Sequence, residues 1–380
     1  MEGYLTAEIS VSAVAHNVRL IRSRLQRGTL FCPAVKADCY GHGLQFVLPA
    51  LQDADCLAVA TPQEAIQVRQ TGWTGDILAF FSPCAYQRES DITEALDELI
   101  AAKVSLTVVK PDDVHHVCAS ASRLGMRAKV HLKVDSGMHR SGVHVQSAVE
   151  IIELVGKHPQ LELAGVYTHF ATADEADKQY ALNQLDCFRQ AAAGLKCKPL
   201  LHAANSAALI DMPQSHLDMV RPGIALYGYQ PSDEMHNKLP LRPVLRVLSR
   251  VMQVREVPAG AAAGYGLTRR FERATRLGLV PIGYADGYFR CLSNKAVMKI
   301  GQAYAPVAGR VSMDQTILDI TDAGNVSIGQ QVEVISDDPA APNSVENLAK
   351  LAGTIPHEVT CRLGGRIRRV ARVEDSRPTP

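Results

Sequence analysis

Residues 104–135 read VSLTVVKPDDVHHVCASASRLGMRAKVHLKVD, with two apolar, β-rich runs on either side of a longer segment. The runs VSLTVV and AKVHLKVD have the composition of buried strands, and the segment between them has the period of a helix. A strand, a helix and a second strand in this order predict two parallel strands that are joined by a crossover helix.

The same alternation continues from about residue 30 to residue 228. The strand candidates, eight in all, are LFCPAVK, CLAVA, DILAFF, VSLTVV, AKVHLKVD, LAGVYTH, LLHAAN and MVRPGIALYG. Intervening segments such as TPQEAIQVRQ and DKQYALNQLDCFRQAAAGL are typical of helices. This repetition predicts an α/β protein with a (β/α)8 TIM-type barrel. A doubly wound open sheet is the main alternative.

The pattern changes after Gly228. A polar linker, QPSDEMHNKLP, leads into short runs separated by Gly, Pro and Asp: VLRVLSRVMQVREV, LGLVPIG, YAPVAG, QTILDI and QVEVIS. These runs predict a smaller β domain with one helix, SVENLAKLAG, near its end. The first ten residues could supply a strand to either domain. We expect residues 1–10 to join the β domain, 11–232 to form the barrel and 233–380 to form the C-terminal β domain.

Composition narrows the classes of function. The 380 residues exceed one ordinary core, which favours two domains. Forty basic and 39 acidic residues give a net charge of +1, which argues against nucleic acid or a membrane surface as a partner. We expect no signal peptide and no membrane span. The nine cysteines form no C-x-x-C pair, so we expect a reducing, cytoplasmic setting and no metal site.

Polar side chains recur where the predicted strands end. In a barrel, the carboxyl ends of the strands are where reactive residues lie. The residues at these ends are Lys36, Lys133, Asp135, Tyr167, His169, His202, Asn205, Ser206 and Arg221. Several polar residues at one edge indicate a site at that mouth of the barrel.

Lys36 ends the first apolar run, where it either surfaces from a strand or lies in a desolvated pocket. A desolvated lysine can form a Schiff base with an aldehyde. Barrels tend to bind phosphate at the ends of strands seven and eight. There, Ser206 offers a hydroxyl or a helix cap, and Gly223 and Ile224 offer backbone N–H groups. Together these features suggest pyridoxal phosphate (PLP) as a cofactor.

Beyond these patterns, AVKADCYGHG resembles the PLP-lysine motif of bacterial alanine racemases. Further segments resemble that family in the family's order: HLKVDSGMHRSG, GVYTHFATADE, HAANSAA, VRPGIALYG, GYGLT, PIGYADGY, GRVSMDQ and CRLGGRIRRV. The resemblance spans almost the whole chain. It implies interconversion of L- and D-alanine, which supplies D-alanine for cell-wall peptidoglycan. It also implies a homodimer whose active sites take residues from both subunits.

The resemblance also implies roles for individual residues. Lys36 would carry PLP, and Lys36 and Tyr265 would be the two catalytic bases. The other cofactor-binding residues would be Tyr40, His169, Asn205, Ser206, Arg221, Gly223 and Ile224. The substrate-binding residues would be Arg140, Tyr284, Met313, Asp314 and His357. Lys133 matches a position that is often carbamylated in this family.

Racemisation needs a proton removed on one face of Cα and returned on the other, so two bases are the simplest arrangement. Lysine and tyrosine have pKa values of roughly 10 in water, and cationic neighbours or desolvation would have to lower them. The resemblance suggests a hydrogen-bond chain of Tyr265, His169 and Arg221 for this purpose. Lys133 would repel Arg140 unless it is carbamylated or Asp135 partly neutralises the arginine.

Some positions depart from the family pattern. His357 stands where a tyrosine is usual near the substrate entrance, and His139 replaces a frequent glycine. The first departure leaves the substrate range open. The alternatives are therefore a broader alanine/serine racemase, a PLP-dependent amino-acid decarboxylase of the same fold, and a non-catalytic PLP carrier.

Overall fold

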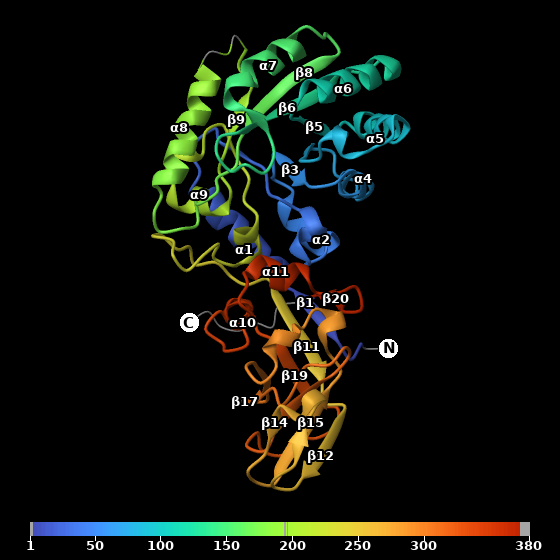
Figure 1. Cartoon of the computed structure of the whole chain (residues 1–380), viewed down its shortest axis with the longest axis vertical. Coiled ribbons are helices and arrows are strands. Elements are labelled where there is room, and N and C mark those ends of the chain that lie inside the picture. The colour runs from blue at the N-terminus through green and yellow to red at the C-terminus, as the bar shows by residue number, and fades with distance from the viewer. Residues whose placement is uncertain (1–2, 194, 196, 373–380) are drawn as a thin grey trace.

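The computed structural model describes residues 3–193, 195 and 197–372, which form a β/α barrel followed by a β domain (Figure 1). Parallel strands line the barrel in the order β2-β10-β9-β8-β6-β5-β4-β3. A parallel bridge between Ala34 and Ala58 brings the two end strands together and nearly closes the ring. The predicted (β/α)8 barrel is confirmed, and the open doubly wound sheet is wrong.

The barrel strands are short. Their bounds are β2 (Leu30–Phe31), β3 (Cys56–Val59), β4 (Asp76–Ala79), β5 (Ser105–Val108), β6 (Ala128–Asp135), β8 (Leu161–Tyr167), β9 (Leu200–His202) and β10 (Met219–Val220), with β7 (Val143–His144) beside the end of β6. Pro33 follows β2 and Pro222 follows β10. Because proline has no N–H to donate to a ladder, both strands end sooner than their apolar runs predict.

Helices surround the strands in Figure 1. They are α1 (Val11–Arg22), α2 (Lys36–Tyr40), α3 (Leu44–Val47), α4 (Pro62–Gln70), α5 (Glu89–Ala101), α6 (Pro111–Leu124), α7 (Ala148–Gly156), α8 (Gln179–Ala193) and α9 (Ser206–Asp211). Local chemistry sets their ends. At the start of α4, Thr61 and Glu64 form a capping box, and α6 stops at Gly125, whose φ of +62° suits glycine.

The C-terminal domain contains a six-stranded sheet in the order β17-β16-β19-β11-β1-β20, a three-stranded sheet β12-β15-β18 and a hairpin β13-β14. The strands are β1 (Thr6–Ile9), β11 (Leu245–Arg250), β12 (Gln253–Val257), β13 (Ala262–Ala263), β14 (Arg269–Arg270), β15 (Thr275–Val280), β16 (Val297–Ile300), β17 (Ala303–Pro306), β18 (Thr316–Asp319), β19 (Gln331–Ile335) and β20 (Arg368–Ala371). β1 pairs antiparallel with β11 and parallel with β20.

Two helices complete this domain, α10 (Val345–Ala352) and α11 (Pro356–Cys361). The first is the helix that SVENLAKLAG predicts, with Ser344 as its N-cap. The second was not predicted, because its six residues are too few to show a helical period. It packs against α2 of the barrel, so the two domains meet next to Lys36.

Candidate active site

Lys36 begins α2, a single turn whose backbone is left-handed. Ala37, Asp38, Cys39 and Tyr40 have φ values of 51°, 50°, 56° and 55°. Left-handed helical backbone costs roughly 1–2 kcal/mol per residue other than glycine. Four such residues in a row persist only where the surrounding structure holds them.

Contacts from distant parts of the chain hold this turn. The Glu64 carboxylate accepts the Ala37 N–H through Oε1 and the Ala60 N–H through Oε2, both at 2.7 Å. Arg369, in β20, donates its Nε–H to the carbonyl oxygen of Gly41 at 2.7 Å. The fold therefore fixes the lysine and the tyrosine of the turn relative to the barrel.

A cradle for an anion lies beside Tyr40. Ser206 Oγ accepts the N–H groups of Gly223, at 2.8 Å, and Ala225, at 3.3 Å. A Cβ on Gly223 would lie 2.3 Å from the Tyr40 hydroxyl oxygen, so only glycine allows this close approach. The N–H of the buried Ile224 has no acceptor within the described part of the chain. Two hydroxyls and a free N–H therefore meet in one place, and they fit a phosphate group.

Two further observations support this cradle. Burial raises the pKa of Tyr40, which therefore keeps its proton and can donate it in a hydrogen bond. The N-cap of α9 is Asn205, whose side chain accepts the Ala208 N–H at 3.0 Å. Because Asn205 provides the cap, the Ser206 hydroxyl is left to interact with a ligand.

Cations face one another at the mouth of the barrel. Burial, followed by the Arg140 charge, lowers the pKa of Lys36. Burial, followed by the charges of Arg140 and Arg221, lowers the pKa of Lys133 to about 8. The mutual repulsion of these groups means that the site favours anionic ligands.

The Asp135 carboxylate, which could partly neutralise Arg140, contacts other groups of the same loop. Its Oδ1 accepts the N–H groups of Gly137 and His139, both at 3.0 Å, and Oδ2 lies 3.4 Å from His139 Nδ1. His139 has a φ of +56°, which explains why glycine is favoured at this position. The carboxylate therefore shapes the loop that carries Arg140, and it leaves the guanidinium available.

Arg221 lies buried beneath the mouth in a chain of fixed hydrogen bonds. Its Nη1 contacts His202 Nδ1 at 2.7 Å, and its Nη2 donates to the carbonyl oxygens of Thr168 and Ala203 at 2.7 and 3.2 Å. Because a guanidinium only donates, His202 Nδ1 must accept, and the His202 proton must sit on Nε2. His202 Nε2 then donates to His131 Nδ1 at 2.9 Å.

Both histidines of this chain are neutral. Burial lowers the pKa of His202 well below its usual value, and it lowers the pKa of His131 to about 3. Burial also lowers the pKa of Arg221 to about 10, so the arginine stays charged at neutral pH. A permanent cation thus faces the site from below.

Tyr167 and His202, which the sequence placed at strand ends without a role, form a stack in this region. Their ring centroids lie 4.9 Å apart with the planes at 11°. The Arg221 Cζ lies 5.1 Å from the Tyr167 centroid, and the buried Tyr167 hydroxyl contacts Thr107 Oγ1 at 3.0 Å. The aromatic ring therefore supports both the arginine and its histidine partner.

His169 follows β8 and lies among the same cations. Burial, and then the charges of Arg221 and Arg140, lower its pKa well below the usual value. Within the residues that the structure describes, no hydrogen bond joins His169 to Arg221 or Tyr265. The expected Tyr265–His169–Arg221 chain is therefore not formed within one copy of the protein, and Arg221 bonds to His202 instead.

His357, on α11, lies beside the left-handed turn of its own barrel. Its ring centroid is 5.9 Å from that of Tyr40. Burial, followed by the Lys36 charge, lowers its pKa to about 4, so the imidazole is neutral. Its buried Nδ1 has no hydrogen-bond partner. This atom therefore has a hydrogen-bonding capacity that no group in the described chain uses.

The remaining predicted residues of the second domain are exposed. The side chains of Tyr265, Tyr284 and Met313 are 70%, 43% and 53% exposed. Tyr265 lies in η6 (Tyr265–Leu267), between β13 and β14, which Figure 1 places at the opposite end of the C-terminal domain from α2. Asp314 forms an ion pair with Arg366 at 2.7 Å. One copy of the chain therefore does not bring Tyr265 to the lysine.

Glu64, which holds the turn of Lys36, was not predicted as a site residue. A signal was present, because T-x-x-E at residues 61–64 is a capping-box pattern at a helix start. His131 was also missed, because a single histidine in an apolar run does not show its partner.

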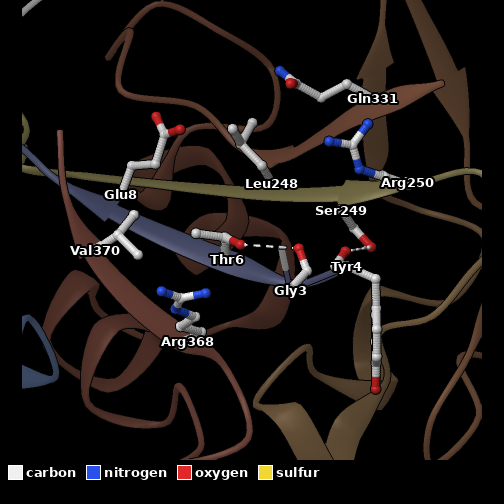
Figure 2. A pocket seen from close by; sticks show the side chains of 10 residues that line it. All are labelled: Gly3, Tyr4, Thr6, Glu8, Leu248, Ser249, Arg250, Gln331, Arg368 and Val370. Carbon is white, nitrogen blue, oxygen red and sulfur yellow. Dashed lines mark hydrogen bonds between the residues drawn. The ribbon is translucent and has the colours of Figure 1, made fainter. Parts of the chain in front are cut away.

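A pocket of about 310 Å³ lies elsewhere, against the sheet of the C-terminal domain (Figure 2). It is lined by Gly3, Tyr4, Thr6, Glu8, Leu248, Ser249, Arg250, Gln331, Arg368 and Val370, none of which is a predicted site residue. Over residues 3–193, 195 and 197–372, no group of three or more His, Cys, Asp or Glu is placed to hold a metal ion. No helix in the same residues is long and apolar enough to cross a membrane.

The fold and this site together define a class, that of β/α-barrel enzymes with a partly desolvated lysine beside an anion cradle. Family models for the alanine racemase N-terminal domain and C-terminal domain match residues 9–231 and 244–371. The chain belongs to the alanine racemase family.

Individual relatives agree with this assignment. The chain is 38% identical to the alanine racemase of Desulfovibrio desulfuricans over 374 residues, covering 96% of this chain and 97% of that protein. Among solved structures, the alanine racemase of Clostridium difficile 630 is 35% identical with a TM-score of 0.90, covering 98% and 96% of the two chains. The alanine racemase of Bartonella henselae with covalently bound pyridoxal phosphate is 26% identical with a TM-score of 0.86, covering 97% and 100%.

Proposed function

We propose that this protein is a PLP-dependent alanine racemase that interconverts L- and D-alanine with Lys36 and Tyr265 as bases. The observation that carries the proposal is the placement of Lys36 beside the cradle of Tyr40, Ser206 and the free Ile224 N–H. Membership of a PLP-dependent family supports it. The proposal includes a cytoplasmic supply of D-alanine for peptidoglycan, in keeping with free thiols at the cysteines whose side chains the structure describes.

The residues of the barrel mouth fit the cofactor. Lys36 would hold PLP covalently, the cradle would bind its phosphate, and His169 would cover the ring. Arg221 would meet the pyridine nitrogen as a hydrogen-bond donor, because its guanidinium cannot accept. Bound PLP supplies the electron sink that makes the Cα–H of an amino acid removable.

The two bases act on opposite faces of Cα. The lowered pKa of Lys36 gives its amine a larger neutral fraction near neutral pH, as a base requires. Tyr265 would deliver or remove the proton on the other face. Arg140 would orient the substrate by its carboxylate, with Tyr284, Met313 and Asp314 completing the pocket.

Because Tyr265 is exposed and distant from Lys36, we propose a homodimer in which each site takes Tyr265 from the partner subunit. The exposed apolar side chains of Tyr265, Leu267 and Met313 support this proposal, since such groups on one face are typical of an interface. The neutral His169 would then be available to contact the incoming tyrosine.

We also propose that Lys133 is carbamylated. Its pKa of about 8 leaves a useful fraction of free amine to react with carbon dioxide, and the resulting anion would remove its repulsion with Arg140. Protein prepared in ¹³C-bicarbonate should show a carbamate carbonyl resonance that the Lys133→Ala variant lacks. The same spectrum from both proteins would contradict the modification.

A broader alanine/serine specificity is the second candidate, because the unpartnered Nδ1 of His357 could bond to a serine hydroxyl. A decarboxylase or a non-catalytic PLP carrier is not supported by the family assignment. An assay that follows carbon dioxide release together with optical rotation separates all of these activities.

The decisive experiment measures racemisation of alanine, serine, lysine and arginine by the purified protein, and the PLP link in Lys36→Ala. We expect alanine to be the best substrate. The variant should lose the visible absorbance and the borohydride-reducible link to PLP, whereas Lys129→Ala, an exposed lysine of the barrel, should keep both. Retention of the link in Lys36→Ala would contradict the assignment.

A further inference from the structure

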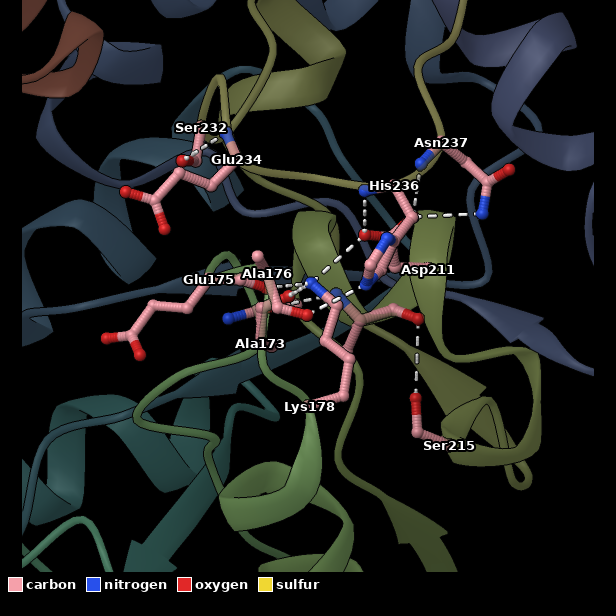
Figure 3. Close-up of polar contacts among 12 residues, drawn as sticks. Ala173, Glu175, Ala176, Lys178, Asp211, Ser215, Ser232, Glu234, His236 and Asn237 are labelled. Atoms are coloured by element: carbon pink, nitrogen blue, oxygen red, sulfur yellow. Dashed lines mark hydrogen bonds and ion pairs between the residues drawn. The ribbon is translucent and has the colours of Figure 1, made fainter.

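The start of α8 connects three segments around the candidate site (Figure 3). Lys178, just before the helix, forms an ion pair with Asp211 at 3.0 Å between Nζ and Oδ2. The side chain of Asp211 is fully buried and that of Lys178 is 12% exposed. An exposed ion pair contributes little to stability. Removing one partner of a buried pair leaves an uncompensated charge, so the Lys178–Asp211 pair holds the two segments that carry it in place.

Asp211 ties the linker between the domains to this point. Its Oδ1 accepts the backbone and side-chain N–H groups of Asn237 at 2.8 and 3.1 Å, and its Oδ2 accepts the His236 N–H at 3.0 Å. Asp211 is also the last residue of α9, whose first residue is the Ser206 of the cradle. The carboxylate thereby links the cradle helix with the linker.

Lys178 fixes the loop that follows His169. Its ammonium donates to the carbonyl oxygens of Ala173, at 2.8 Å, and Glu175. His236 Nε2 donates to the Ala176 carbonyl oxygen at 2.8 Å, and Figure 3 shows these groups converging from the loop and the linker. The loop would lose several backbone partners together if the ion pair were broken.

Tyr180, in the first turn of α8, extends this connection to the Arg140 loop. Its hydroxyl donates to the Gly137 carbonyl oxygen at 2.7 Å. Gly137 lies three residues before Arg140, whose exposed side chain forms no hydrogen bond or ion pair within the described part of the chain. The position of the Arg140 loop therefore depends on the position of the α8 start.

We propose that the Lys178–Asp211 pair and Tyr180 are positioning residues that hold the Arg140 loop, residues 136–142, where its guanidinium can receive a substrate carboxylate. The ion pair holds the start of α8 in place, and the hydrogen bond from the Tyr180 hydroxyl then holds Gly137 against that helix. The role of Arg140 in this proposal rests on the proposed function. The connection between residues 171–178 and the Arg140 loop does not.

The test uses hydrogen–deuterium exchange and steady-state kinetics on the PLP-loaded full chain. In Asp211→Asn, exchange should accelerate both in residues 171–178 and in the Arg140 loop, where the Gly137 and His139 N–H groups are bonded to Asp135. Tyr180→Phe should accelerate only the Arg140 loop. It should also raise KM for alanine about tenfold with kcat changed less than about twofold, the pattern of lost substrate binding.

The lysine and tyrosine variants have matched controls. Lys178→Met is compared with Lys129→Met, because Lys129 pairs with Asp76 at an exposed site. Tyr180→Phe is compared with Tyr304→Phe. If Asp211→Asn does not fold, Tyr180→Phe decides. Unchanged exchange in the Arg140 loop of Tyr180→Phe would overturn the proposal, as would an unchanged KM in an active enzyme. If the wild-type protein does not racemise alanine, the proposed function fails, and the exchange data still decide the link between the loops.

Discussion

Tyr265 is the residue with the largest difference between its proposed role and its position in a single chain. Its side chain is 70% exposed, although proton transfer requires a group in contact with Cα. The proposed homodimer would explain this position, because a second copy of the protein would cover the side chain. Tyr265 is therefore the most informative residue for a test of the two-base proposal.

We expect Tyr265→Phe to slow racemisation from both the L and the D side by roughly 10²-fold or more, the contribution of one general acid–base group. Both directions need both faces, so neither should be spared. Bound PLP should stay at the wild-type level, because Lys36 and the cradle are untouched. Turnover near that of a Tyr304→Phe control would indicate a one-base mechanism.

The second prediction at the residue scale concerns His357 and the preference between serine and alanine. The neutral imidazole of His357 has an unpartnered Nδ1 and lies beside Tyr40. A serine hydroxyl could bond to this nitrogen, whereas an alanine methyl could not. We expect His357→Tyr to lower the serine-to-alanine ratio of kcat/KM about threefold to tenfold, the worth of one hydrogen bond. The ratio is measured with both substrates on one preparation. An unchanged ratio would show that His357 does not set specificity.

At the scale of elements, the barrel interior beside β6, β8 and β9 holds two buried neutral histidines, His131 and His202. The pKa of His131 in the folded protein is about 3 and that of His202 is also lowered, whereas an unfolded histidine has a pKa of about 6.5. Between these values the unfolded chain binds more protons than the folded one. The free energy of unfolding should therefore fall as pH falls below about 6.5.

We expect His131→Asn to make this fall shallower, because asparagine keeps an acceptor for His202 without titrating. One histidine contributes up to about 1.4 kcal/mol per pH unit in the window below its unfolded pKa. Denaturant unfolding at several pH values between 6.5 and 4 measures the slope for both proteins. His16→Asn, on the surface of α1, is the control, and equal slopes for His131→Asn and the wild type would contradict the expectation.

The same elements show what the sequence could predict. The alternation of apolar runs and helical segments predicted the barrel correctly, because that pattern is local. Residues such as Lys36 and Ser206 could be placed at the mouth because strand ends share an edge. The left-handed turn could not be predicted, since the φ values of residues 37–40 depend on Glu64 and Arg369, which lie far away in the sequence. The His131–His202 contact could not be predicted either, because it forms only when the strands assemble into the barrel.

At the scale of the whole molecule, the proposed homodimer makes a prediction that no single-site variant can test. Lys36→Ala should remove the barrel half of a site, and Tyr265→Phe should remove the half that the second domain supplies. We expect a mixture of the two inactive proteins, after subunit exchange, to recover activity, because a hybrid dimer has one intact site out of two. Native mass spectrometry confirms that hybrids have formed. No activity from confirmed hybrids would contradict shared sites.

The left-handed turn has a further consequence, for the order in which the protein is assembled. Arg369 donates to the carbonyl oxygen of Gly41, and a Cβ on Gly41 would lie 2.2 Å from the carbonyl oxygen of Thr360 in α11. Glu64 follows the turn closely in the sequence, but these other braces are translated more than 300 residues after the turn itself. A nascent chain on the ribosome already carries its lysine but lacks these braces. We therefore expect the turn to be fully braced only after translation has passed residue 369.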